Sequence, residues 1–180
     1  FESQYDAKIK LIPQSEKESV ISFVSNKAQT IILTRKLNTN ENNYFKNKKI
    51  KPLETPFAID GIALIKNNKS KDTIQDSSEI VAFLNGKPTK IKGLVFDNAN
   101  SSSTRYLLEL AGLKNIPEKG VFSFNTNNEV IDYVSKNEGM IGVVGMNWIF
   151  QPTEKIKKAL ENITVLSVKD KGSNEYVYPS

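Results

Sequence analysis

The two arginines of this lysine-rich chain each follow a threonine, and both pairs could help to bind an anion. Thr34-Arg35 ends the apolar run "TIILTR", and Thr104-Arg105 comes directly after three serines in "SSSTRYLLEL". The planar guanidinium group of arginine suits a tetrahedral oxyanion, and the neighbouring hydroxyl groups add hydrogen-bond donors. Both pairs are therefore candidate anion-binding residues.

The residues before Arg105 are expected to begin a helix. Ser101–Thr104 are good helix N-caps, the apolar residues after them recur at helical spacing, and Gly112 supplies an end. Arg105 would then lie in the first turn, where the helix dipole disfavours a cation. A bound anion would remove that conflict, and the free N–H groups of a helix start would also bind it.

Ser15 stands at another predicted helix start and could bring a further hydroxyl to the same anion. Ligands of open α/β sheets bind beyond the carboxyl ends of strands, where both threonine–arginine pairs are expected. The alternative is that Ser101–Thr104 only cap a helix. In that case Arg35 and Arg105 would pair with carboxylates such as Asp97. The residue pattern alone leaves both interpretations open.

The composition excludes several classes of catalytic and metal site. Apolar residues make up 38% of the 180 residues and charged residues 25%, which is typical of a soluble, folded chain. The absence of cysteine and histidine excludes thiolate and imidazole metal sites, cysteine nucleophiles and Ser-His-Asp triads. No stretch approaches the ~20 apolar residues of a membrane-spanning helix. We predict a protein that is not an enzyme and has no metal or other cofactor.

The net charge of +5 comes almost entirely from lysines that are spread along the chain. Such lysines are typical of solvated surfaces. A nucleic-acid interface would place arginines and aromatic residues together on one patch, and no such pattern is present. We therefore predict no nucleic-acid partner, although the positive charge could help to draw small anions toward a cleft.

Segments with strand and helix patterns alternate along the chain. Strands are expected at residues 7–13, 30–35, 57–66, 90–97, 140–145 and 163–168. Helices are expected at residues 15–27, 77–87, 101–112, 126–139 and 152–162, with a short helix or turn at 38–47. Capping boxes at Ser15 with Glu18 and Thr126 with Glu129 mark two helix starts. This alternation predicts an α/β protein with mainly parallel sheets.

Four stretches, taken in order, resemble the substrate-binding proteins of bacterial phosphate ABC transporters. They are "TIILTRKL", "ETPFAIDGIALIKN", "FDNANSSSTRYLLEL" and "VIDYVSKNEGMIGVVGMNWI", and the resemblance covers residues 7–170. It implies a type II periplasmic-binding-protein fold, in which two α/β lobes joined by a hinge close over phosphate or a similar oxyanion. It also implies an ABC transporter permease as partner and a periplasmic or cell-surface location, with a lipid anchor in the full-length precursor. The alternative is a surface or sensor domain that keeps the fold without serving transport.

The resemblance also implies ligand-binding residues in the second lobe. Ser102 and Thr104 match the serine and threonine of the family's Arg-x-x-x-Ser-Gly-Thr phosphate loop, and Ser103 stands where the family has glycine. Asn98 stands at the position of the loop's arginine, which is a departure from the family pattern. Either Arg105 or Arg35 is expected to supply the missing charge.

In the first lobe, the resemblance implies three further ligand-binding residues. Thr34 falls where many members have an aspartate that accepts a hydrogen bond from protonated phosphate, and Arg35 follows it. Ser15 matches the helix start that supplies a serine ligand. Glu16, next to it, could restore the missing acceptor. Arg35 and the serine-rich loop at 102–104 are expected to approach one another across a cleft.

The predicted lobes are unequal. Lobe one is expected at residues 1–60 and lobe two at 61–168, with a hinge at 55–63 and a return toward lobe one at 169–180. Family members begin with a further strand and end with a longer return segment. Lobe one is therefore expected to be incomplete, with exposed apolar surface that self-association would cover.

Overall fold

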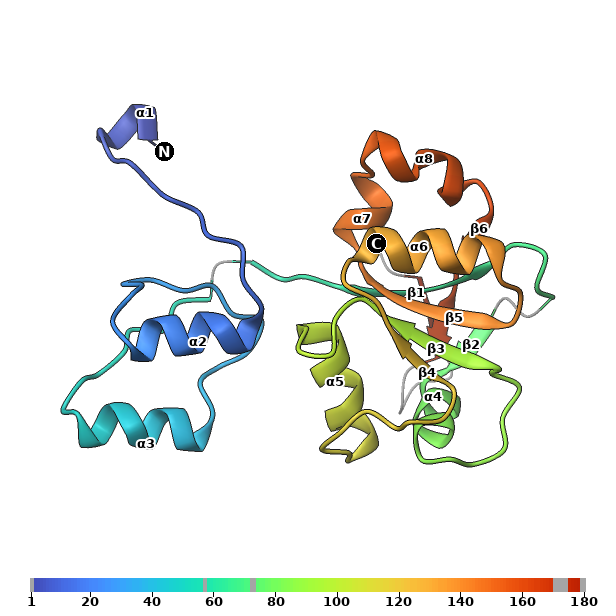
Figure 1. Cartoon of the computed structure of the whole chain (residues 1–180), viewed down its shortest axis with the longest axis horizontal. Coiled ribbons are helices and arrows are strands. Elements are labelled where there is room, and N and C mark those ends of the chain that lie inside the picture. The colour runs from blue at the N-terminus through green and yellow to red at the C-terminus, as the bar shows by residue number, and fades with distance from the viewer. Residues whose placement is uncertain (1, 57, 72–73, 170–174, 179–180) are drawn as a thin grey trace. The chain divides into compact units, whose positions relative to one another are not determined.

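The computed structural model describes residues 2–56, 58–71, 74–169 and 175–178. The chain divides into two compact units, Phe1–Pro52 and Leu53–Ser180 (Figure 1). The lobe boundaries at residues 60 and 168 stay predictions. None of the helices in the described ranges is both long enough and apolar enough to cross a membrane.

The first unit consists of helices and connecting segments. Its helices are α1 (Glu2–Tyr5), α2 (Glu16–Val24) and α3 (Thr39–Asn47). A capping box at Ser15 begins α2, as predicted, and a second capping box at Asn38 begins α3. Within the described residues of this unit only two apolar side chains, Val20 and Phe45, are buried, so its hydrophobic core is small.

The predicted strands at 7–13 and 30–35 are wrong, because neither segment forms a strand in the structure. A strand exists only where a second strand pairs with its backbone groups. No such pairing occurs among the described residues of the first unit. Several large apolar side chains of these two segments are exposed: Ile9, Leu11, Ile12 and Ile32.

The second unit is built on two sheets. The strands are β1 (Ile62–Asn67), β2 (Ile74–Asp76), β3 (Gly93–Phe96), β4 (Val121–Ser123), β5 (Met140–Gly145), β6 (Ile163–Val165), β7 (Ser167–Lys169) and β8 (Tyr176–Val177). The larger sheet has the order β4-β3-β5-β1-β6, and the smaller has the order β2-β7-β8. In the larger sheet β3 runs parallel to both β4 and β5, whereas β1 runs antiparallel to β5 and β6. The predicted α/β class is confirmed. Parallel pairs occur in one half of the larger sheet and between β2 and β7 of the smaller sheet.

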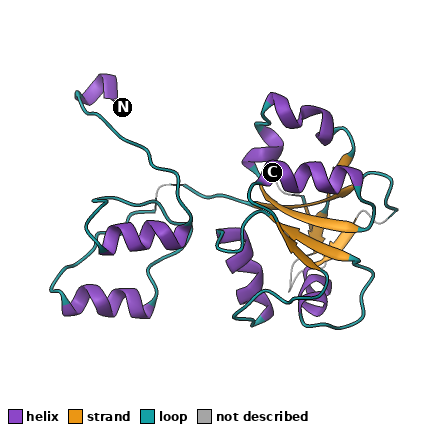
Figure 2. Ribbon diagram, viewed as in Figure 1, coloured by secondary structure: helices purple, strands orange, loops and turns teal. Residues whose placement is uncertain are grey.

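Helices cover both faces of the larger sheet (Figures 1 and 2). They are α4 (Ser77–Leu84), α5 (Ser102–Ala111), α6 (Asn127–Lys136), α7 (Asn147–Phe150) and α8 (Glu154–Leu160). Apolar side chains of α4 and α5 pack with Leu64 and Phe96 on one face. Those of α6 and α8 pack with Ala63 and Ile65 on the other. The alternation of Ala63, Leu64 and Ile65 between the two clusters is the two-residue period of a strand with both faces buried.

Several predicted boundaries differ from the observed ones. The strand predicted from Phe57 begins at Ile62, and Phe57 itself lies outside the described residues. The strand predicted at 163–168 is divided at Leu166 into β6 and β7, which belong to different sheets. The short elements β4 and α7 were not predicted. Part of the predicted return at 169–180 forms β8, which pairs with β7.

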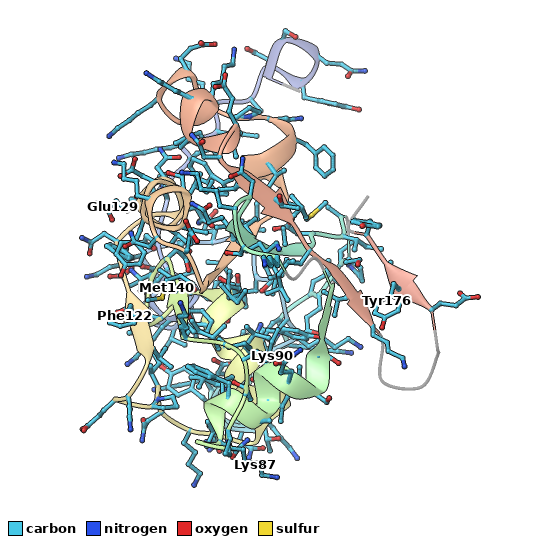
Figure 3. The ribbon with its side chains drawn as sticks, turned by 90° about the vertical axis from the view of Figure 1, so that its right-hand side faces the viewer. Lys87, Lys90, Phe122, Glu129, Met140 and Tyr176 are labelled. Atoms are coloured by element: carbon cyan, nitrogen blue, oxygen red, sulfur yellow. The ribbon has the colours of Figure 1, made fainter. Side chains whose placement is uncertain are left out.

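At two positions the neighbouring side chains leave no room for a Cβ atom, and the chain has glycine at both. The backbone carbonyl of Gly61 accepts a hydrogen bond from the Met146 N–H, and an added Cβ would lie 2.8 Å from Met146 Cγ. At Gly93 an added Cβ would lie 2.6 Å from the sulfur of Met140 and 3.1 Å from the ring of Phe122, both labelled in Figure 3. The backbone therefore approaches the Met146 side chain closely at Gly61, immediately before β1.

Candidate functional site

Helix α5 begins and ends as its sequence predicts. Ser101 is the N-cap, and its hydroxyl accepts a hydrogen bond from the Thr104 N–H at 3.3 Å. Gly112 follows the helix in the left-handed conformation, at φ 71°. The helix start comes after the carboxyl end of β3, and such sheet edges are where α/β proteins commonly bind ligands.

Most hydroxyl groups at this helix start donate a hydrogen bond to another group of the protein. Ser101 and Ser103 both donate to one carboxylate oxygen of Asp97, at 2.7 and 3.2 Å. Thr104 donates to the backbone carbonyl of Asn98 at 2.7 Å. A hydroxyl has a single proton to donate. The predicted ligand-binding residues Ser103 and Thr104 are also buried, at 7% and 0% exposure, and their side chains hold the loop together in this structure.

Ser102 has the uncommitted hydroxyl of this cluster. Within the described ranges, neither that hydroxyl nor the N–H groups of Ser102 and Ser103 have a hydrogen-bond partner. The first N–H groups of a helix lack intrahelical partners and carry the positive end of its dipole. One hydroxyl and two N–H groups at the start of α5 can therefore act together as donors to an anion.

Asp97 receives a third hydrogen bond from a distant part of the sequence. The side-chain amide of Asn127, the first residue of α6, donates to the second carboxylate oxygen of Asp97 at 3.1 Å. The amide oxygen of Asn127 in turn accepts a hydrogen bond from the Gly145 N–H at 3.0 Å. Asp97 follows β3 and Gly145 ends β5, so this network spans the shared carboxyl edge of two parallel strands. Figure 3 labels Glu129, which completes the capping box at the start of α6.

Arg105 points along its own helix. Its guanidinium group forms an ion pair with Glu109, one turn further on, at 3.0 Å, and the Glu109 side chain is 62% exposed. The carboxylate that pairs with Arg105 in this ion pair thus belongs to its own helix. This pair already compensates part of the unfavourable position of a cation near a helix start. A role for Arg105 in anion binding stays a prediction.

Arg35 lies between two carboxylates of the first unit. Its Nε donates to Glu16 at 3.1 Å, and its two terminal nitrogens donate to the two oxygens of Glu41 at 2.7 and 2.9 Å. The Arg35 side chain is only 19% exposed. These hydrogen bonds, that of Glu41 first, raise the pKa of Arg35, which stays charged at any ordinary pH. In this structure Arg35 therefore pairs with carboxylates, which was the alternative to anion binding.

Glu16 also joins the other predicted residues of the first unit. One of its oxygens accepts hydrogen bonds from the N–H and the hydroxyl of Thr34, at 3.3 and 2.9 Å. Ser15, the preceding residue, exchanges hydrogen bonds with Glu18 in the capping box of α2, and these bonds lower the pKa of Glu18. A carboxylate therefore does lie beside Thr34, where the family resemblance leads one to expect an acceptor.

The predicted site residues thus fall into two groups. Ser15, Thr34 and Arg35 lie around Glu16 in the first unit. The others, which are Asn98, Ser102, Ser103, Thr104 and Arg105, lie at the start of α5 in the second unit. The approach of the two groups across a cleft stays a prediction. No cluster of three or more acidic side chains suited to a metal ion occurs among the described residues.

Two residues of these networks, Asn127 and Glu41, carried no recognised signal in the sequence. Asn127 follows the N-cap of α6 and is brought to Asp97 by the sheet, thirty residues away along the chain. Glu41 had a local signal that was missed, because Asn38 and Glu41 have the spacing of a capping box.

The first unit should lose stability in acid because of Glu41. The hydrogen bond from Arg35 holds the pKa of Glu41 below its ordinary value, and the Asn38 N–H acts in the same direction. A carboxylate with a lowered folded-state pKa stabilises the fold above its unfolded-state pKa, ~4.3. That contribution is lost as the pH falls through the lower, folded-state pKa. Hydrogen exchange of α2 and α3 between pH 3 and 7 should show this loss, and Glu41→Gln should show a smaller pH dependence. An equal dependence in both proteins would contradict the assignment.

The fold and the donors at the start of α5 define an α/β protein with a helix start suited to anions. A family model described as a PBP superfamily domain matches residues 1–179. The chain therefore belongs to the PBP superfamily, and the predicted periplasmic-binding-protein fold is confirmed. A search of curated proteins finds no match.

Solved structures of substrate-binding proteins share this fold. An ABC-type phosphate transport receptor from Vibrio cholerae superposes with a TM-score of 0.66 at 14% identity, covering 96% of this chain and 70% of that one. A Clostridium perfringens protein solved with bound phosphate gives 0.63 at 17% identity, covering 93% and 67%. The arginine-bound form of truncated ArgBP from T. maritima gives 0.57 at 11% identity, covering 98% and 70%. At these identities the likeness is one of fold.

This chain spans 60–70% of the length of eight solved structures that share its fold. Those structures include proteins named for phosphate and proteins named for arginine. The fold therefore accommodates more than one class of ligand, and the choice between them rests on the residues of the site.

Proposed function

We propose that this protein binds phosphate or a similar tetrahedral oxyanion and delivers it to the permease of an ABC transporter outside the cytoplasm. The proposal rests on three hydrogen-bond donors at the start of α5 that have no partner among the described residues. The hydroxyl of Ser102 and the N–H groups of Ser102 and Ser103 suit an oxyanion, because each donates and none carries negative charge. Membership of the PBP superfamily supports a role in solute binding.

The residues at the start of α5 favour an oxyanion over an amino acid, and two of the structural neighbours are linked to phosphate by name. The Vibrio cholerae receptor is named for phosphate transport, and the Clostridium perfringens protein holds bound phosphate. The exposed apolar residues of the first unit are proposed to be covered by self-association.

Isothermal titration of the purified chain with phosphate, sulfate, molybdate and L-arginine tests the proposal. We expect phosphate to bind, and Ser102→Ala to weaken binding by about tenfold, since a hydrogen bond to a charged ligand is lost. Ser135→Ala is the matched control. It removes a hydroxyl of α6 that bonds the Asp132 carbonyl, and it should leave the affinity unchanged. Binding of L-arginine without any anion binding would overturn the proposal.

A further inference from the structure

Asn127, the first residue of α6, joins Asp97 and Gly145 through its side-chain amide. Its amide nitrogen donates to Asp97 at 3.1 Å, and its amide oxygen accepts from the Gly145 N–H at 3.0 Å. Only a side chain with a donor and an acceptor at the same end can make both contacts. An aspartate at this position would keep the second contact. It would lose the first and would place a like charge against Asp97.

Asp97, which Asn127 holds in position, in turn contacts the start of α5. It accepts hydrogen bonds from Ser101 and from Ser103, the residues on either side of Ser102. The backbone at Ser102 is therefore held at both flanks by one carboxylate. The donors that we assign to the oxyanion, the Ser102 hydroxyl and the N–H groups of Ser102 and Ser103, depend on that geometry.

We infer that Asn127 is a positioning residue for the oxyanion site, acting through Asp97. This inference rests on the proposed function, since it concerns the donors of the same site. Through Asn127 the starts of α5 and α6 and the end of β5 are hydrogen-bonded as one unit, so the ligand donors of α5 are fixed relative to the sheet. A change at position 127 should therefore alter ligand affinity through Asp97.

Exchanging the two side chains offers a direct test. Asn127→Asp alone puts two carboxylates together and should weaken phosphate binding by at least about tenfold. The double variant Asp97→Asn with Asn127→Asp keeps the total charge and reverses the donor and acceptor of the pair. The asparagine at position 97 would accept from the serines and donate to position 127, where the carboxylate still accepts from Gly145. Affinity should return to within about threefold of the natural chain.

The matched control is Asn125→Asp, which adds the same charge two residues earlier at an exposed side chain. Its effect on phosphate affinity should stay within about threefold, because a surface charge is screened by solvent and salt. Fluorescence of Trp148 checks that the second unit of each variant is folded. The double variant keeps the test open if Asn127→Asp fails to fold.

Hydrogen exchange of the Ser102 and Ser103 amides, measured without ligand, separates this inference from the proposed function. Asn127→Asp should speed their exchange, and the double variant should slow it again. Unchanged exchange and affinity in Asn127→Asp would overturn the inference, as would a double variant that restores neither. If the natural chain binds none of phosphate, sulfate and molybdate, the proposed function is wrong, and the exchange rates alone decide whether Asn127 holds Ser102 in place.

Discussion

Replacing Arg35 by methionine is expected to unfold the first unit, whereas the same replacement at Arg105 should change stability little. Arg35 is 19% exposed, and its partners Glu16 and Glu41 are 9% and 15% exposed. Without the guanidinium group, two poorly solvated carboxylates would face each other with no cation between them. Breaking a buried ion pair from one side costs about 3 kcal/mol or more. The first unit, with its small core, is not expected to withstand such a loss.

The two arginines form a matched pair for this experiment. Arg105 is paired with a glutamate that is 62% exposed, and such surface pairs contribute about 0.5 kcal/mol. Hydrogen exchange of α2 and α3 reports on the first unit, and Trp148 fluorescence in urea reports on the second. Arg35→Met should expose the amides of α2 and α3 and leave the Trp148 transition unchanged. Protected amides in that variant would show that the carboxylates do not need their cation.

Helix starts were the part of the fold that the sequence predicted best, because their signals are local. The capping boxes at Ser15 and Thr126 and the serine cap at Ser101 were all confirmed. Each depends on residues within one turn of the helix, so a short stretch of sequence contains the whole interaction. The glycine end of α5 is predictable for the same reason.

Strands in the first unit could not be predicted in this way. The apolar pattern at 30–35 is typical of a buried strand, yet Ile32 is exposed and the segment pairs with no strand in the described residues. A strand pattern states only that a segment can pair. Whether it does depends on a partner from elsewhere.

The candidate site was predictable in part. The cluster at Ser101–Thr104 was found because hydroxyl residues before an apolar helix pattern are easily recognised. The hydrogen bond from Ser101 to Asp97 was not predicted. The contact of Asp97 with Asn127 joins two segments that are distant in the sequence and that only the sheet brings together. Long-range hydrogen bonds of this kind have no characteristic residue spacing, so a single sequence does not predict them.

Gly142→Val is expected to destabilise the second unit by about 3 kcal/mol, because the centre of its sheet has no room for a side chain. Gly142 lies on β5 between Ile65 of β1 and Val95 of β3. An added Cβ would lie 2.8 Å from Ile65 Cγ1 and 2.9 Å from Val134 Cγ2 of α6. Ile65 and Val134 are both fully buried, so neither can move aside into solvent. Urea unfolding followed by Trp148 fluorescence would measure the loss.

The control separates crowding from backbone conformation. Gly86 has φ 72° and no atom within 4 Å of an added Cβ, so Gly86→Ala brings backbone strain of about 1 kcal/mol without any clash. The substitution at Gly142 should also weaken phosphate binding, because a side chain there pushes α6 outward, and α6 carries Asn127. Gly86→Ala should leave phosphate affinity unchanged. If Gly142→Val lost stability yet bound phosphate as the natural chain does, the start of α6 would have no part in holding the ligand donors of α5.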